Sequence, residues 1–256
     1  MRSRRARLRP DDVGLGGWGT RRVPGLRREE VAQLANVGLT WYTWLEQGRD
    51  VHPSDGVLHA VADALRLDAY EREYVFALAR DQDKDERTAD RSLGQPQLTQ
   101  LAEGFGPAPA YAISPRFDVL AHNRVAARLF GDLGPGLPTP TNIMRLAFTD
   151  PAWRDLIVDW HQEAARHVAM YRAGMTFHLD DPAWTQLPDE LAQLSVDFAR
   201  YWSRNDVAGP ERRLKRFRHP VVGEMTLQST SLLLADDPMA VLDARTSVRN
   251  LDGQEP

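Results

Sequence analysis

Apolar residues recur with helical spacing through the first 80 residues and predict five short helices. The two central helices span about 26–35 and 39–47, and only three residues separate them. Asn36 suits the left-handed backbone of a sharp turn, and Gly38 and Gly48 suit the two ends of the second helix. Two helices joined in this way predict a helix-turn-helix, which places its second helix in the major groove of DNA.

The outward face of this second helix carries the candidate DNA contacts. Side chains at the start of such a helix reach base edges, and the methyl and hydroxyl groups of threonine and leucine can read them. Arginines beside the helix are better placed for phosphates, which fix the register. The tryptophans either join this surface or cover the core of a small bundle. The predicted set is Arg27, Arg28, Leu39, Thr40, Trp41, Thr43, Trp44 and Arg49.

Beyond residue 97 the pattern changes to strands, then helices, then strands. Segments 110–114 and 118–122 alternate as a hairpin, and long helical stripes cover 151–174 and 188–204. Three further strands are predicted at 214–219, 224–234 and 240–244. Strands that flank a helical middle predict an α+β domain, in which helices pack against one face of an antiparallel sheet.

These patterns divide the chain into two domains. We expect an all-α helix-turn-helix domain at 1–80 and the α+β domain at 98–250. Residues 81–97 are charged and poor in apolar side chains, which predicts a linker, and 251–256 are expected to be a disordered tail.

The charge is unevenly distributed between these parts. The chain has a net charge of -4, but residues 1–50 hold ten arginines against six acids, which leaves -8 for the remainder. A basic start favours contact with a polyanion such as DNA, although a solvated arginine-rich end has the same composition. There is no cysteine and no apolar run of membrane-spanning length, so we expect a cytoplasmic protein without a membrane partner.

Motifs for catalysis are missing from the sequence. It has no phosphate-binding loop, no nucleophile elbow and no His-Glu-x-x-His pair. His161 and His167 are six residues apart and fall on different faces of a helix, and Asp181 before Pro182 is typical of a helix cap. We therefore expect no catalytic residues, no metal site and no cofactor. A hydrolase site assembled across the fold remains the alternative.

Four segments resemble one family of regulators. Segments 24–32 (PGLRREEVA) and 40–49 (TWYTWLEQGR) resemble the Cro/repressor (XRE) class, and in particular the MmyB-like regulators. Segments 111–123 (YAISPRFDVLAHN) and 217–224 (FRHPVVGE) resemble the ligand-binding domain of that family. The resemblance implies a lambda-repressor-like bundle followed by a PAS-like domain.

The chain also departs from the family. Asn36, Gly38 and His122 stand where glycine, serine and tryptophan are commoner. The family's first helix is longer than the one predicted between Arg2 and Arg9, which favours a start upstream of this one.

The resemblance further implies a small apolar or fatty-acid-like ligand held between the sheet and the helices. Aromatic residues on the predicted helices and strands are the candidates for its pocket, although such stripes are commonly just core: Trp160, Tyr171, Phe198, Trp202 and Phe217. His219, Arg218 or Arg216 could bind a carboxylate head group, and the alternative is that each is a surface or strand-edge residue.

Together these features predict a ligand-responsive transcription regulator that binds double-stranded DNA as a homodimer. Two-fold symmetry would match two half-sites about 34 Å apart. The alternative is a protein-interaction module in which the helical domain binds another protein and the second domain dimerises.

Overall fold

The chain divides into two compact units, each described by itself. The first unit is Met1–Asp83 with Arg204–Ala208, and the second is Lys84–Ser203 with Gly209–Pro256. The predicted linker as far as residue 92 and the predicted tail lie outside the residues that the structure describes. The computed structural model describes residues 1–16, 25–49, 51–79, 93–131, 133, 141–209, 211, 213–234 and 237–247.

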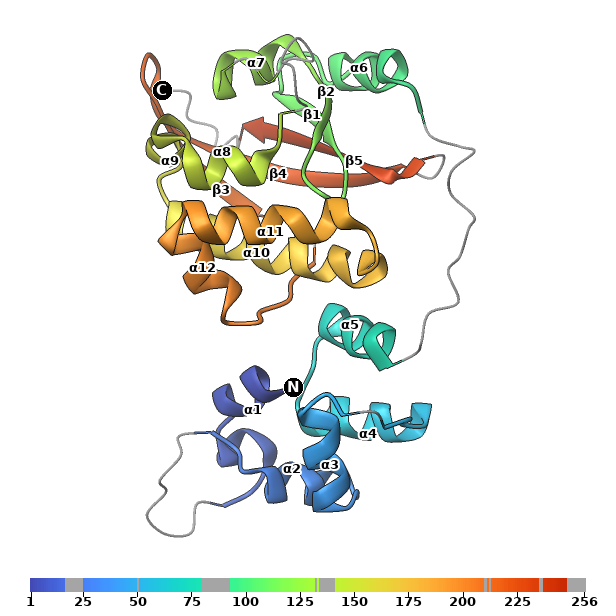
Figure 1. Ribbon diagram of the computed structural model, residues 1–256. Coiled ribbons are helices and arrows are strands. Elements are labelled where there is room, and N and C mark those ends of the chain that lie inside the picture. Colours follow the sequence, from blue (N-terminus) through green and yellow to red (C-terminus); the bar gives the residue numbers. More distant parts are fainter. Residues whose placement is uncertain are drawn as a thin grey trace. The chain divides into compact units, whose positions relative to one another are not determined.

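The first unit is helical, and the five predicted helices are present (Figure 1). A short 3-10 turn, η1 (Pro10–Val13), follows the first of them. The helices are α1 (Arg2–Arg7), α2 (Arg28–Leu34), α3 (Leu39–Glu46), α4 (Asp55–Ala64) and α5 (Ala69–Ala79).

Left-handed residues end three of these helices in the same way. After α2, Asn36 has φ 53° and its N–H donates to Gln33, while the N–H of Val37 donates to Ala32 at 2.9 Å. Gly48 after α3 and Arg66 after α4 repeat the arrangement. These are Schellman motifs, which satisfy the last carbonyls of a helix and turn the chain sharply. The prediction for Asn36 is confirmed.

The core of the first unit forms where the helices cross. Val31 and Ala32 of α2 and Ala35 directly after it are buried, and Tyr42 of α3 is fully covered. Leu34 has the helical spacing of the same apolar stripe, but it is 36% exposed. The three buried residues already fill the inner side of this short helix, so Leu34 turns outward.

The second unit is built on a five-stranded antiparallel sheet. Its strand order is β2-β1-β5-β4-β3, in agreement with the PAS-like fold that the resemblance implies. All four neighbouring pairs run antiparallel. The strands are β1 (Ala110–Ile113), β2 (Val119–His122), β3 (Arg213–His219), β4 (Gly223–Leu234) and β5 (Asp237–Ser247).

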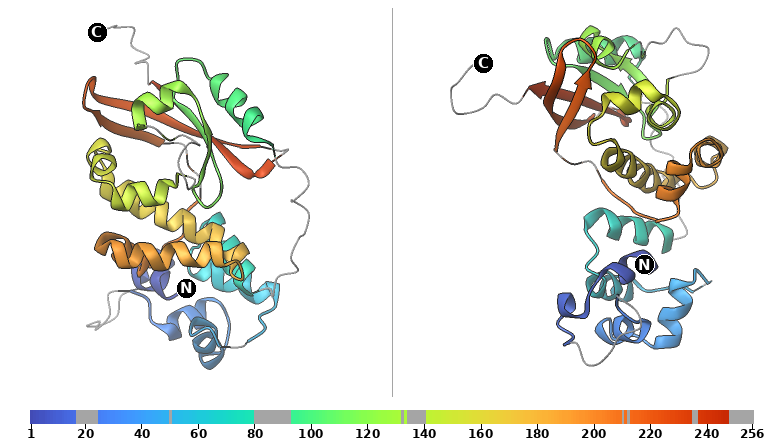
Figure 2. Two further views of the ribbon diagram at one scale, coloured as in Figure 1. Left: turned by 45° about the horizontal axis from the view of Figure 1, so that its top comes forward. Right: turned by 90° about the vertical axis from the view of Figure 1, so that its left-hand side faces the viewer.

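Helices cover the two faces of this sheet unequally. α6 (Gln95–Glu103) packs Leu98 and Ala102 on the alanine-rich face of β1 and β2. The opposite face meets the large core, and both views of Figure 2 keep α10, α11 and α12 on that side. The helices of this core are α7 (Arg124–Phe130), α8 (Ile143–Thr149), α9 (Pro151–Leu156), α10 (Trp160–Met175), α11 (Pro182–Leu194) and α12 (Val196–Trp202), with the 3-10 turn η2 (Thr176–His178) after α10.

Two predicted long helices are each broken in the structure. The helix expected at 151–174 stops after Leu156, because Ile157 bridges to Phe217 of β3 and the N–H of Val158 donates to Arg216. The apolar spacing continues across this break and therefore did not reveal it. The sequence prediction also missed α8.

The helix expected at 188–204 was misplaced as well. α11 begins at Pro182, and Ser195 separates it from α12 by accepting a hydrogen bond from the N–H of Phe198. Pro188 lies inside α11, where its missing N–H leaves the carbonyl of Trp184 without a helical partner. The hydroxyl of Tyr171 donates to that carbonyl at 2.8 Å, which offsets the loss.

A buried asparagine joins the sheet to its flanking helices. Asn123 is completely buried and caps α7 by accepting a hydrogen bond from the N–H of Ala126. Its Oδ1 also accepts from Ala110, and its Nδ2 donates to the carbonyls of Ala102 and Ala108. All four hydrogen-bonding positions of the amide are used, so α6, β1 and α7 meet at one side chain.

Gly25 provides a test of packing in the first unit. A Cβ at Gly25 would lie 2.5 Å from the carbonyl oxygen of Ala6, which is backbone and cannot swing away. Gly56, within α4, has open space around the equivalent position. We therefore expect Gly25→Ala to lower the melting temperature of the full chain. Gly56→Ala should raise stability by about 0.5–1 kcal/mol, because alanine favours helix. Equal effects in thermal unfolding would contradict the close approach to α1.

Candidate DNA-binding surface and ligand-binding interior

α3 presents a mixed polar and apolar surface. Leu39 is 47% exposed and Trp44 40% exposed, and Thr40 is also exposed. Trp41 and Thr43 are half-buried. Tyr42 faces the core on the opposite side of the helix. This is the division that the helical spacing predicted.

The far end of α3 is held by a buried carboxylate. The side chain of Glu46 is 1% exposed and receives hydrogen bonds from two arginines. Arg5 donates from Nε at 2.6 Å, and Arg28 donates from Nε at 2.5 Å. Arg5 also donates to the carbonyl of Leu26, and the hydroxyl of Tyr42 donates to Glu46 at 3.3 Å. The recognition helix is thus tied to α1, to α2 and to the segment before α2.

The two arginines control the ionisation of Glu46. Burial by itself raises the pKa of Glu46, but the hydrogen bonds from Arg5 and Arg28 outweigh it and lower the pKa below its ordinary value of 4.5. The carboxylate is therefore charged at neutral pH, and the triad is an internal ion cluster.

This cluster changes the interpretation of Arg28. The sequence analysis placed Arg28 with Arg27 and Arg49 as a phosphate contact, whereas its Nε is bonded to Glu46. Arg27 and Arg49 are exposed beside α3 and remain candidates for phosphates. Leu34, which is 36% exposed, joins this surface next to the turn.

The candidate aromatic ligand residues of the second unit all belong to its large apolar core, and we call these five the aromatic cluster. Trp160, Tyr171, Phe198 and Phe217 are all at most 5% exposed, and Trp202 packs on them. Phe198 stacks on Trp202 with ring centroids 5.7 Å apart. The structure therefore brings the five aromatic residues together, and their contact with a ligand stays a prediction.

The predicted head-group residues lie elsewhere. Arg216 and Arg218 are exposed and pair with Asp159 and Glu224, because alternate residues of β3 point to opposite faces. His219 lies at the strand end, with Nε2 3.1 Å from the carbonyl of Arg128 and with Nδ1 accepting from the turn that follows. Arg216 and Arg218 therefore point away from the aromatic cluster.

A different set of charged and polar side chains lies on the inner face of the sheet. It lies between the sheet and α10, and we call it the inner polar band: Tyr111, Glu163, His167, Arg213, Lys215, Ser229, Asp243 and Arg245. The sequence analysis missed this band, yet its β3 members could have been found. Counting back by twos from the inward Phe217 gives Lys215 and Arg213.

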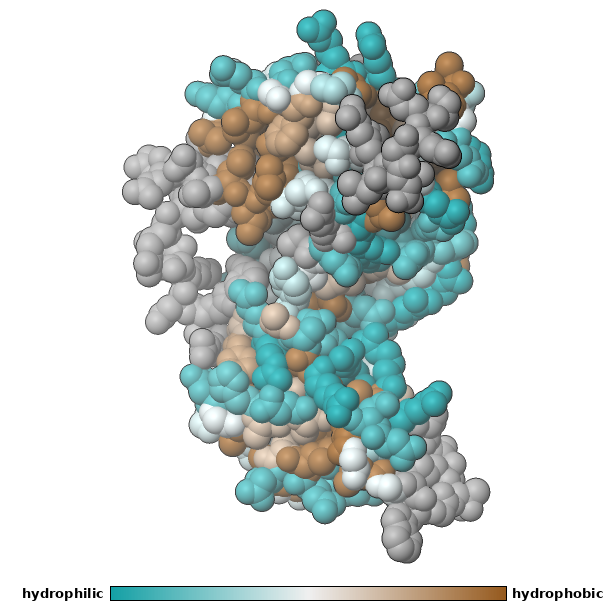
Figure 3. Space-filling view, turned by 180° about the vertical axis from the view of Figure 1, so that it is seen from behind, coloured by the Kyte–Doolittle hydropathy of each residue, from teal (hydrophilic) through white to brown (hydrophobic). Residues whose placement is uncertain are grey.

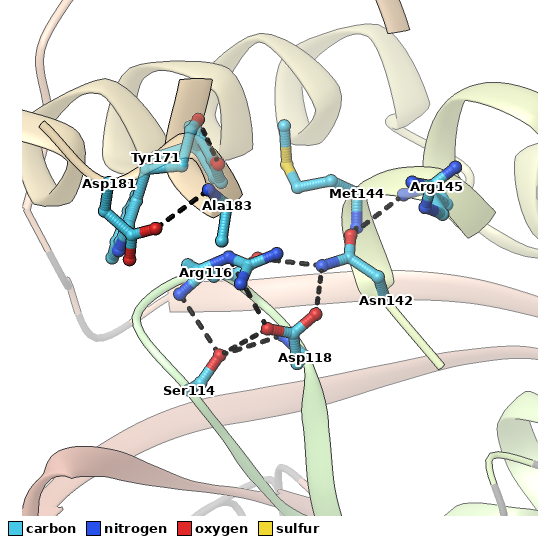
Figure 4. A network of polar contacts seen from close by, with 10 residues as sticks. Ser114, Arg116, Asp118, Asn142, Met144, Arg145, Tyr171, Asp181 and Ala183 are labelled. Atoms are coloured by element: carbon cyan, nitrogen blue, oxygen red, sulfur yellow. Dashed lines mark hydrogen bonds and ion pairs between the residues drawn. The ribbon is translucent and has the colours of Figure 1, made fainter. Parts of the chain in front are cut away.

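The β1–β2 turn carries a separate network (Figure 4). Asn142, at the start of α8, donates to the carboxylate of Asp118 at 2.8 Å and to the carbonyl of Arg116 at 2.9 Å. Ser114 accepts from the N–H groups of Arg116 and Asp118. These bonds attach the hairpin to the start of α8.

Among the residues that the structure describes, His, Cys, Asp and Glu side chains nowhere gather in a group of three that could hold a metal ion. A surface hollow of about 430 Å³ lies at the junction of α9 and α10, between Arg154 and Arg218. Within the described parts of the chain, no helix is long and apolar enough to cross a membrane.

A helix-turn-helix followed by a separate α+β unit defines a DNA-binding regulator with a sensory domain. Comparison with protein families agrees with this class. The helix-turn-helix domain matches residues 1–75, and the MmyB-like transcription regulator ligand binding domain matches residues 95–246. The chain belongs to the MmyB-like transcription regulators. No curated protein matches it.

The ion cluster at Glu46 predicts how the first unit responds to substitution and to acid. Glu46→Gln leaves two arginines without their carboxylate and should cost about 3 kcal/mol of unfolding free energy. Because the folded-state pKa is lowered, the Glu46 contribution is complete above pH 4.5 and is lost as pH falls through the lowered pKa.

Denaturant unfolding at several pH values measures the difference in unfolding free energy between Glu46→Gln and the original chain. Glu29→Gln is the matched control, since Glu29 makes only an exposed 3.8 Å ion pair with Arg27. A gap between Glu46→Gln and the original chain that stays constant from pH 7 to pH 3 would refute the role of ionisation.

Proposed function

We propose that this regulator binds a specific DNA sequence through α3 and controls transcription in response to a small molecule. The observation that carries the proposal is the outward surface of Leu39, Thr40 and Trp44 on a helix whose other end is fixed by Glu46. A rigid helix with exposed methyl, hydroxyl and indole groups suits the reading of base edges. Such a protein acts by binding, without catalysis, in the cytoplasm.

The ligand belongs in the second unit, on the helical side of the sheet. The aromatic cluster supplies apolar surface for a small molecule with an apolar part, in line with the fatty-acid-like ligand that the resemblance implies. Movement of α10 or the sheet on binding would be the signal passed to the DNA-binding unit.

We further propose that the regulator is a homodimer through the uncovered part of its sheet. α6 packs on β1 and β2, whereas Leu214 of β3 and Leu232 of β4 stay 56% and 42% exposed. Strand pairing places these two leucines on the same face as Leu242, which lies beneath α6. Hydrophobic side chains gather on part of the second unit in Figure 3. A self-complementary apolar face suits a two-fold dimer.

DNA binding can be tested by fluorescence anisotropy on the duplex upstream of the protein's own gene, with a scrambled duplex beside it. Thr40→Ala should reduce the preference between the two by about 1–3 kcal/mol, because Thr40 is placed to read bases. Arg49→Gln should weaken both equally and lower the salt slope by about 0.9, because it loses one phosphate contact. If the unaltered protein binds neither duplex at low salt, the proposed function is wrong.

The oligomeric state provides a separate test. We expect the chain to sediment as a dimer and the double variant Leu214→Asn with Leu232→Asn to sediment as a monomer at the same concentration. Val196→Asn, which changes an 88% exposed residue on α12, is the control and should remain a dimer. If the double variant still sediments as a dimer, the interface lies on another surface.

A further inference from the structure

The outward face of α3 is made of methyl-bearing and aromatic side chains. Successive residues of a helix are turned by about 100°, so that roughly 140° of its circumference holds four side chains that reach solvent wholly or in part. We call them the recognition face: Leu39, Thr43, Thr40 and Trp44. Thr43 is half-buried and the other three are exposed, whereas Tyr42 and Glu46 lie on the opposite side and are covered.

The recognition face carries no charge and no amide. Glu46 is the only charged residue of α3, and its buried carboxylate is occupied by Arg5 and Arg28. The helix contains no arginine, lysine, asparagine or glutamine. The recognition face therefore offers methyl groups, an indole ring and two hydroxyls. The exposed amides of the helix-turn-helix all lie outside α3: Gln33, Asn36 and Gln47.

The four bases differ in what they present to such a surface in the major groove. Guanine presents two acceptors that arginine or lysine bind, adenine presents a donor and an acceptor that asparagine or glutamine bind, and cytosine presents an amino group that carboxylates accept. The recognition face has none of these side chains. Thymine presents a C5-methyl group, which contacts apolar side chains and the methyl group of threonine. Of the four bases, thymine is thus the one that the recognition face matches.

Burial of this apolar surface supplies the driving force, and charge selects the partner. Leu39 and Trp44 contact water in the free chain, so covering them with a thymine methyl removes apolar area on both sides of the contact. One buried methyl group corresponds to a gain of about three- to fourfold in affinity. A protein groove could cover the same side chains, but the exposed guanidinium groups of Arg27 and Arg49 beside α3 complement phosphates, which favours DNA.

We propose that α3 recognises DNA by the C5-methyl groups of thymines, which Leu39, Thr40 and Trp44 contact in the major groove. The inference rests on the proposed DNA-binding function and names the chemical group that gives it specificity. Thr40 acts through its methyl group and not through its hydroxyl. The preferred sites are therefore rich in thymine where α3 enters the groove, whereas Arg27 and Arg49 bind phosphates whatever the sequence.

The test begins with the selection of duplexes from a random-sequence pool by the full chain. Each enriched duplex is then made in a second version, in which deoxyuridine replaces thymidine and so removes only the C5-methyl group. Fluorescence anisotropy should show the deoxyuridine version binding at least about tenfold more weakly, which is the effect of two lost methyl contacts. The slope of affinity against salt concentration should be the same for both versions, because the phosphate contacts are unchanged.

Variants of Thr40 separate its methyl group from its hydroxyl. Thr40→Ser keeps the hydroxyl and should lower the preference for thymidine over deoxyuridine by about three- to fourfold. Thr40→Val keeps a methyl group in place of the hydroxyl and should preserve the preference. Leu39→Ala should also lower the preference. Leu78→Ala is the matched control and should leave it unchanged, since Leu78 lies on α5 and is 51% exposed, close to the 47% of Leu39.

The outcomes separate this inference from the proposed function. Enriched duplexes that bind equally well with deoxyuridine would overturn the inference and leave sequence-specific DNA binding intact. A preference that Thr40→Ser retains and Thr40→Val loses would overturn it too, because the hydroxyl would then be the group that reads the base. If the pool yields no enriched sequence, the proposed function itself is wrong, and the recognition face is left to a protein partner.

Discussion

The burial of Phe217 organises the second unit. Its backbone bridges to Ile157 and so ends α9 before α10 can begin. The centroid of its ring lies 5.7 Å from that of Phe130, and the ring packs beside the guanidinium of Arg245. Because successive residues of a strand face opposite sides, fixing Phe217 inward also fixes which charges of β3 lie inside. A slip of one residue in β3 would turn Arg213 and Lys215 outward and bring Arg216 and Arg218 to the inner face.

Local signals made much of the fold predictable. The helix-turn-helix followed from residues that act through their own backbone, such as Asn36 in the left-handed region and Gly48 after α3. The helix cap at Asp181 was predictable for the same reason, since it depends only on neighbours within a few residues.

Features decided by distant partners could not be predicted in this way. The apolar spacing from Trp153 to Tyr171 is continuous, and only the pairing of Ile157 with a strand sixty residues away interrupts the helix. The choice of Arg216 and Arg218 as head-group contacts had another cause. The two arginines were chosen for their charge alone. Successive residues of a strand face opposite sides of the sheet, so an inward Phe217 places Arg216 and Arg218 on the outer face. Of the candidate site, the aromatic residues were foreseeable, whereas Glu163 and Arg245 needed the assembled sheet.

The attachment of Glu46 to Arg5 has a consequence for how such regulators can be recombined. The recognition helix is not an independent cassette, because its last turn is fastened to a residue forty-one positions earlier in the chain. A chimaera that transplants only the helix-turn-helix would keep Arg28 but would bring the buried carboxylate into a scaffold without Arg5. Exchange of DNA specificity between relatives should therefore move α1 and α3 as a pair.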